Sequence, residues 1–198
     1  IFFGLILRPP CGNVFRYLAL LGCFLGAVAG QSQGSGLPSY YQPALHAYGE
    51  KDGLPHPTVQ AIAQDPQGRL WVGTQDGAAV FNGKLWRTLN LPKIARSNYV
   101  RALLFDGAGA LWVGTQDDGL WLHQGDAWTR LELPTTPSNP RINGLTRTLA
   151  ADGSETIWVS TGGSGLLRWR QKTWTHFDHR MGLPSDWVWS LRQARDGV

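Results

Sequence analysis

The chain has 198 residues, of which 42% are hydrophobic, enough to build one or two ordinary domains and too many for a disordered chain. Ten Trp and 25 Gly against a single Met favour strands joined by tight turns over helices. The net charge is +4, but residues 30–198 carry 16 basic and 14 acidic groups scattered singly, so we expect no nucleic-acid partner.

The N-terminal segment has the order of parts found in an export signal. Arg16 precedes an apolar run of roughly a dozen residues, which ends in Ala27-Val28-Ala29. This order predicts a secretory signal peptide over residues 1–29, cleaved after Ala29 and followed by a linker over residues 30–45. The alternative is a hydrophobic N-terminal segment that stays uncleaved as an anchor.

Cysteine is confined to this N-terminal segment. Cys11 and Cys23 are the two cysteines of the chain. We therefore expect the exported part to have no disulfide and no cysteine-based metal site, and to depend on packing for its stability.

A repeat of forty-odd residues begins after the linker. Its four registers start at β-branched anchor residues spaced by 41, 42 and 46 residues, namely Val59, Val100, Ile142 and Val188. The string Leu-Trp-Val-Gly-Thr comes eleven residues after each of the first two anchors, and a similar string comes fifteen residues after the third. The third copy thus has four extra residues, which we place in one hairpin.

Each repeat contains four short alternating runs separated by turn signals. In the first copy the runs are residues 59–65, 69–74, 78–82 and 84–89, with Asp-Pro-Gln-Gly and Asn-Gly among the turns. Four antiparallel strands at this period describe one blade of a β-propeller. The predicted fold is all-β: residues 46–198 form a partial propeller with three complete four-stranded blades and the first strand of a fourth. Because a ring typically needs four to eight blades, we interpret this part as a propeller fragment.

The tryptophan of each repeated string is the predicted blade core. These residues are Trp71, Trp112 and Trp158. Propeller blades pack face to face around an axis, and a large ring fills the wedge that widens between neighbouring sheets.

The string GLPHPTVQAIAQDPQGRLWVGTQDGAAVFNGKLW, residues 53–86, resembles the two-component regulator propeller repeat. Blades of that family run Gly-Leu-Pro, Ser-Asn-x-Val, Asp-x-x-Gly-x-Leu-Trp-Val-Gly-Thr and then Gly-Leu. The resemblance covers about residues 46–198. The third copy departs from it with Glu155 at the position of the turn glycine, and the fourth with Ala194 at the position of the turn aspartate.

The resemblance implies the periplasmic sensor region of a bacterial histidine kinase or diguanylate cyclase. It implies an inner-membrane protein whose membrane span and output domain lie outside the propeller, with the remaining blades of the same chain as partners and a homodimer in the full-length receptor. The signal would be a small molecule or a carbohydrate. The alternative function is a secreted lectin-like scaffold or propeller enzyme without a signalling output.

No catalytic residue, cofactor or metal site is predicted from the motifs. The glycine-rich stretch at residues 160–167 lacks a phosphate-loop pattern, so we interpret it as a hairpin turn. Asp117 and Asp118 lie at a hairpin tip, where we expect both to be solvated. His176, Asp178 and His179 lack a third and fourth ligand partner, so a solvated loop is the better interpretation.

Ligand contacts are predicted in the connections that lead into each first strand, because these converge over the axis of a propeller. The candidate contact residues are His56, Arg96, Tyr99, Arg141 and Trp187. Aromatic faces mixed with arginine and asparagine suit a sugar or another polar, ring-containing ligand. In the same connections, Asn98, Asn139 and Asp186 are expected to cap turns by bonding to the backbone.

Overall fold

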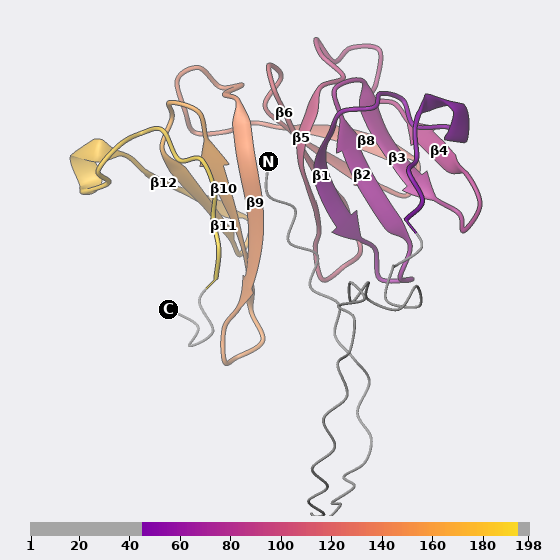
Figure 1. Cartoon of the computed structure of the whole chain (residues 1–198). Coiled ribbons are helices and arrows are strands. Elements are labelled where there is room, and N and C mark those ends of the chain that lie inside the picture. The colour runs from indigo at the N-terminus through magenta and orange to yellow at the C-terminus, as the bar shows by residue number, and fades with distance from the viewer. Residues whose placement is uncertain (1–44, 194–198) are drawn as a thin grey trace, which may run out of the picture. The chain divides into compact units, whose positions relative to one another are not determined.

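The computed structural model describes residues 45–193, and within them twelve strands form three four-stranded antiparallel sheets (Figure 1). The predicted signal peptide, the linker up to residue 44, and Ala194 lie outside the described residues. The predicted all-β fold of three complete blades is confirmed, but the predicted first strand of a fourth blade is not formed by residues 188–193, the last that the structure describes. Besides the strands, residues 45–193 contain two short 3-10 helices, η2 (Glu50–Asp52) and η3 (His179–Met181).

Each sheet is a meander whose strands pair in chain order. Blade 1 contains β1 (Val59–Gln64), β2 (Leu70–Thr74), β3 (Gly77–Phe81) and β4 (Trp86–Leu89). Blade 2 contains β5 (Val100–Phe105), β6 (Leu111–Thr115), β7 (Leu120–Gln124) and β8 (Ala127–Leu131). Blade 3 contains β9 (Ile142–Leu149), β10 (Glu155–Thr161), β11 (Leu166–Arg170) and β12 (Thr173–Phe177).

The first strands of successive blades lie next to one another. β5 contacts both β1 and β9, so the three sheets share one inner line of strands (Figure 1). This arrangement is that of consecutive propeller blades around an axis.

The first hairpin of blade 3 contains the four extra residues of the third repeat. β9 and β10 have 8 and 7 residues, whereas β5 and β6 have 6 and 5. Each strand of the hairpin is therefore two residues longer, and the rest of the blade keeps its dimensions.

The glycine of the repeated string lies under the anchor residue of the next blade. A Cβ atom built on Gly114 would lie 2.4 Å from Ile142 Cγ2, and one on Gly73 would lie 2.6 Å from Val100 Cγ1. Both distances are far below van der Waals contact, so a glycine is required for the two inner strands to approach this closely.

Two of the three repeated tryptophans fill the space between blades. Trp71 packs with Val100 and Leu103 of blade 2, and Trp112 packs with Ile142 and other residues of blade 3. The indole of Trp112 makes edge contacts with Trp169 and Trp174, with 6.4 Å between ring centroids in each pair. Trp158 is only half-buried, because no blade among the described residues packs against its face of blade 3.

An aspartate six residues before each of the first two tryptophans fixes the indole. Trp71 Nε1 donates to Asp65 Oδ2 at 2.9 Å, and Trp112 Nε1 donates to Asp106 Oδ2 at 2.9 Å. The same carboxylates accept from the backbone of their own turns, as the turn chemistry predicts. In the longer hairpin of blade 3, Trp158 Nε1 instead donates to Thr148 Oγ1 at 3.1 Å.

No helix within residues 45–193 has the length and apolar character needed to span a membrane.

The Trp112→Ala variant should lose about 3–5 kcal/mol of unfolding free energy, because it leaves a cavity between blades 2 and 3. Thermal and urea unfolding would measure the loss. Trp189→Ala is the matched control, since Trp189 is 63% exposed and its truncation should cost less than about 1 kcal/mol. Equal effects of the two substitutions would contradict the role of Trp112 as an interblade wedge.

The Asp65→Asn variant should be less stable than the parent, and the difference in unfolding free energy should be largest near neutral pH. Burial raises the pKa of Asp65, but hydrogen bonds from the Trp71 indole and from Arg69 outweigh it and hold the pKa below its usual value. A carboxyl with a depressed folded pKa stabilises the fold above its unfolded pKa, about 3.9, and loses this contribution as the pH falls through the folded pKa. The stability gap between parent and variant should therefore shrink below about pH 4. Urea unfolding from pH 7 to pH 3 measures it, and a constant gap would contradict the expectation.

Candidate functional site

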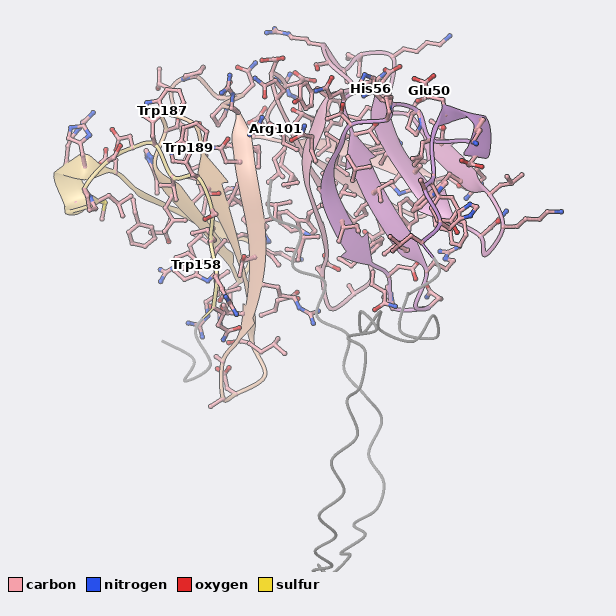
Figure 2. The ribbon with its side chains drawn as sticks, in the orientation of Figure 1. Glu50, His56, Arg101, Trp158, Trp187 and Trp189 are labelled. Atoms are coloured by element: carbon pink, nitrogen blue, oxygen red, sulfur yellow. The ribbon has the colours of Figure 1, made fainter. Side chains whose placement is uncertain are left out.

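The connecting loops and the hairpin tips of the blades meet at one end of the sheets. A connecting loop here is the segment before a first strand, residues 90–99, 132–141 and 178–187, and a tip is the turn between the second and third strands of a blade. Figure 2 shows His56, Arg101 and Trp187 at this end, while Trp158 lies further along blade 3.

Backbone hydrogen bonds join the connecting loops to neighbouring blade tips, and the loop 90–99 is bonded to the tips on both sides of it. Gly77 N in blade 1 donates to Asn98 O at 2.8 Å, and Gln116 N in blade 2 donates to Tyr99 O at 2.9 Å. In blade 3, Gly162 N donates to Arg141 O at 2.9 Å. The loops are thus held by the sheets, and side chains on them have fixed starting points.

The polar residues expected to cap turns also hold the loops. Asn98 Nδ2 donates to Asp76 Oδ1 at 3.3 Å, and Asn139 Nδ2 donates to Asp117 O at 3.4 Å. Asp186 accepts from the backbone N of His179 at 2.7 Å and pairs with its ring. The hydrogen bonds from the His179 ring and backbone hold the pKa of Asp186 below its usual value.

The structure brings two of the five predicted contact residues together. Arg141 and Trp187 line a hollow of about 280 Å³ between blades 2 and 3, and the other residues lining it are Gln116, Asp117, Pro137, Asn139, Pro140, Gly162, Gly163 and Ser164. Trp187 is 51% exposed. This hollow is the candidate functional site.

The other three predicted contact residues lie elsewhere. Tyr99 OH accepts from Gln75 Nε2 at 3.3 Å, against the tip of blade 1. Arg96 lines a separate hollow formed within its own connecting loop, residues 90–98. His56 Nδ1 accepts from the backbone N of Thr58 at 3.0 Å, which is a local turn contact.

The glycine-rich tip of blade 3 has no free amide for an anion. Gly162 N bonds Arg141 O, Gly163 N and Gly165 N bond Asp186 O, and Ser164 N bonds Thr161 Oγ1. Since a phosphate cradle needs converging unpaired amides, the turn interpretation of this stretch agrees with the geometry.

The expectation that Asp117 and Asp118 are both solvated is wrong for Asp118. Asp117 is exposed, but Asp118 is fully buried at 0% exposure. Its Oδ2 accepts from Arg96 N and from Trp121 Nε1, both at 3.2 Å, and its Oδ1 pairs with Arg130 Nη2 at 3.0 Å. The tip of blade 2 is one residue longer than that of blade 1, and this turns Asp118 inward, where it ties the connecting loop to the blade.

His176, Asp178 and His179 each have structural contacts in their loop. His176 Nε2 bonds Ser164 O at 2.8 Å, Asp178 caps η3 through the backbone N of Arg180, and His179 pairs with Asp186. Within residues 45–193 no group of three or more histidine, cysteine or acidic side chains is arranged to hold a metal ion.

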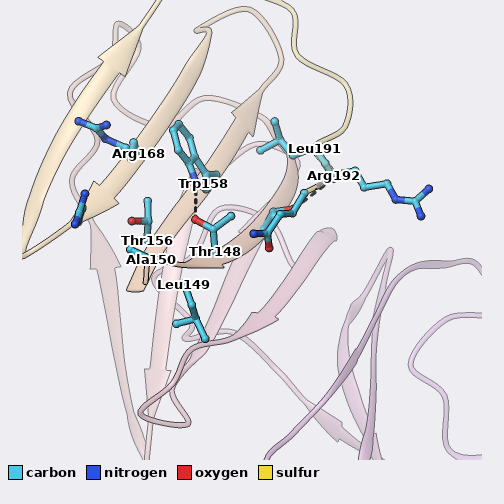
Figure 3. Close-up of a pocket in the computed structure, with 11 residues that line it drawn as sticks. Thr148, Leu149, Ala150, Thr156, Trp158, Arg168, Leu191 and Arg192 are labelled. Atoms are coloured by element: carbon cyan, nitrogen blue, oxygen red, sulfur yellow. Dashed lines mark hydrogen bonds between the residues drawn. The ribbon is translucent and has the colours of Figure 1, made fainter. Parts of the chain in front are cut away.

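A larger hollow of about 380 Å³ lies on the face of blade 3 around Trp158 (Figure 3). Thr148 and Arg168 from the blade and Leu191 from the segment after β12 line it. The corresponding faces of blades 1 and 2 pack against the next blade. We therefore interpret this hollow as a blade-packing surface.

Comparisons with known proteins agree with this architecture. The profile of the family described as two component regulator propeller matches residues 53–76 and 95–117, which run from a connecting loop to the repeated Leu-Trp-Val-Gly-Thr strand and its tip. The predicted resemblance to that repeat is confirmed. No match was found among curated proteins.

Two solved structures from B. thetaiotaomicron show the same fold. The extracellular domain of the hybrid two component system BT3049 has 24% sequence identity and a TM-score of 0.62, over 77% of this chain and 23% of that one. The extracellular domain of the one component system BT4673 has 22% identity and a TM-score of 0.59, over 73% of this chain and 20% of that one. The chain thus spans less than a quarter of the length of either solved extracellular domain.

The Asp118→Ala variant should lose about 1–3 kcal/mol of unfolding free energy, because it leaves the Trp121 indole and the Arg96 amide without their buried acceptor. Hydrogen exchange at the Arg96 amide should also speed up. Asp117→Ala is the matched control at the adjacent exposed position and should change neither quantity. Slow exchange at Arg96 in the Asp118 variant would show that the connecting loop does not depend on this carboxylate.

Proposed function

The chain carries two component regulator propeller repeats, and we propose that its blades form the extracytoplasmic ligand-sensing module of a bacterial transmembrane signalling receptor. The output domain of such a receptor would be a histidine kinase or a diguanylate cyclase, in the periplasmic and inner-membrane arrangement that the repeat family implies. In such a receptor, the module would act as a homodimer and transmit ligand binding across the membrane.

The repeats are the observation that carries this assignment most strongly. The family model matches residues 53–76 and 95–117, in blades 1 and 2 and the loops that lead into them. In the same row of blades, the next two connecting loops hold Arg141 and Trp187 over a hollow of about 280 Å³. Loops placed on a rigid scaffold are the usual location of binding residues. A tryptophan ring beside arginine, asparagine and aspartate side chains suits a polar, ring-containing ligand such as a carbohydrate.

Export is supported by the sequence of residues 14–29, which has the order of a signal peptide. The two solved relatives are themselves extracellular domains. Because residues 30–198 contain no cysteine, an oxidising compartment would form no disulfide in the propeller.

A secreted lectin-like scaffold or propeller enzyme would use the same end of the blades but have no output domain. The reading frame of the natural gene separates the two functions. A membrane span followed by a kinase or cyclase domain supports the receptor, whereas ring closure followed soon by a stop codon supports the secreted scaffold.

Alkaline phosphatase fused after residue 193 should be active in a Gram-negative bacterium, because that enzyme folds only outside the cytoplasm. Deleting residues 14–29 should abolish its activity, while the corresponding fusions to β-galactosidase should show the opposite pattern. Phosphatase activity that survives the deletion, or that never develops in the intact fusion, would contradict an extracytoplasmic propeller.

A further inference from the structure

The tip of blade 3 lacks the side chains that fill the tips of blades 1 and 2. After the threonine of each repeated string, blade 1 continues with Gln75-Asp76 and blade 2 with Gln116-Asp117, whereas blade 3 continues with Gly162-Gly163. In blade 1, Gln75 Nε2 donates to Tyr99 OH at 3.3 Å, and in blade 2, Gln116 Oε1 accepts from Arg101 Nη1 at 3.0 Å. Glutamine thus closes two of the three tips.

Arg141 and Trp187 lie over the two glycines of this tip instead, and the tighter of the two contacts is that of Arg141 with Gly162. A Cβ atom on Gly162 would lie 3.1 Å from Arg141 Cδ, and one on Gly163 would lie 3.5 Å from Trp187 Cε2. The backbone of Gly162 bonds Arg141 O and forms a β-bridge with Trp187. A single residue therefore sets the positions of the guanidinium stem and the indole.

The two side chains have unused binding capacity. Arg141 forms no ion pair with a carboxylate of residues 45–193, and the indole of Trp187 is half-exposed. An arginine guanidinium is suited to a planar carboxylate, which it can bind through two parallel hydrogen bonds. An exposed indole face is suited to stacking against a ring.

The other residues that line the hollow restrict the chemical class of the ligand further. The amides of the glycine tip are all used, so the backbone offers nothing to a phosphate, and Arg141 is the cation that lines the hollow. Asp117 and Asn139 also line the hollow and can accept hydrogen bonds from hydroxyl groups.

We propose that this hollow binds a ring that carries a carboxylate group, with the ring stacked on Trp187 and the carboxylate paired to Arg141. The Gly162 position determines this specificity, because a Cβ atom there would lie 3.1 Å from Arg141 Cδ and displace the guanidinium that pairs with the carboxylate. The assignment rests on the proposed sensing role of these blades. An acidic sugar and an aromatic acid share this chemistry, and Asp117 and Asn139 favour the hydroxylated ring of the sugar.

Binding is best measured on the full chain by titration calorimetry and by the indole NMR signals, with three probes. Glucuronate has both the ring hydroxyls and the carboxylate, glucose lacks the carboxylate, and benzoate lacks the hydroxyls. Glucuronate should bind with a dissociation constant on the order of 1 mM and shift the Trp187 indole signal, as expected for a small ligand on an open site. Glucose should bind at least about tenfold more weakly, and benzoate should fall between them.

Variants locate the binding within the hollow. Gly162→Gln restores the residue found at the other two tips and should abolish glucuronate binding, because the new side chain displaces Arg141, whose Cδ would lie 3.1 Å from the added Cβ atom. The blades should stay folded, since the displaced atoms belong to a flexible side chain rather than to backbone. Gly49→Gln is the matched control, because nothing lies within 4 Å of a Cβ atom at that extended position. Arg141→Gln should weaken glucuronate about tenfold while leaving glucose unchanged. An unchanged Trp112 indole signal in each variant shows that the blades remain folded.

The failure of this assignment can be told apart from the failure of the sensing role. Stronger binding of glucose than glucuronate, or glucuronate binding that survives Gly162→Gln, overturns the carboxylate assignment while leaving a sensor in place. Benzoate binding more tightly than glucuronate retains the carboxylate and identifies an aromatic acid as the source. No binding of any of the three probes overturns the carboxylate assignment. The sensing role is tested separately with a reporter gene whose expression the full-length receptor controls. If the reporter responds to none of a panel of sugars and organic acids, the sensing role is overturned.

Discussion

The blades depend on a close contact between an anchor residue and a glycine of the blade before it. Ile142 packs where the Cβ atom of Gly114 would stand, and Val100 packs in the same way on Gly73. The string Leu-Trp-Val-Gly-Thr is written twice because each inner strand must leave room for the next. Blade 3 solves the same problem differently: Ser160 takes the glycine position, and its partner across the ladder is Gly144, where the other blades have alanine. In blade 3 the glycine of the cross-strand pair is thus on the first strand instead of the second, and the pair is still made of two small residues.

This contact fixes the spacing of the inner strands, and the tryptophans then fill the outward-widening space. Trp112 reaches Trp169 and Trp174 on the outer half of blade 3, which an aliphatic side chain at the same position would not reach. The bond from the indole nitrogen to Asp106 satisfies its one polar group and holds the ring in a single orientation. Packing and turn chemistry therefore support each other, because one carboxylate closes the turn and orients the wedge.

The repeat was sufficient to predict the blades, because its register follows from local patterns. The anchors Val59, Val100 and Ile142 are the first residues of β1, β5 and β9, and the four extra residues lie in the predicted hairpin.

The candidate site was only partly predictable from the sequence. Pattern placed Arg141 and Trp187 on connecting loops, but which side chains meet depends on contacts between blades, and these separate them from Tyr99, Arg96 and His56. The burial of Asp118 was also not predicted, because hairpin tips are usually solvated and only the extra residue of this tip turns the carboxylate inward. An alignment of the three tips would have revealed the glycines of blade 3 as the signal for the hollow.

A tip with two adjacent glycines would be costly on its own, because glycine loses more backbone freedom on folding than any other residue. Here the loss is offset by bonds that do not involve the side chains of the tip. Thr161 Oγ1 donates to Gly165 O at 2.7 Å and accepts from Ser164 N, and Asp186 O accepts from two further amides. The threonines of blades 1 and 2 make the equivalent bond to Gly77 O and Gly119 O. The threonine that ends each repeated string thus holds the hairpin whatever residues stand at its tip, so the tip can be filled by side chains in one blade and left open in another.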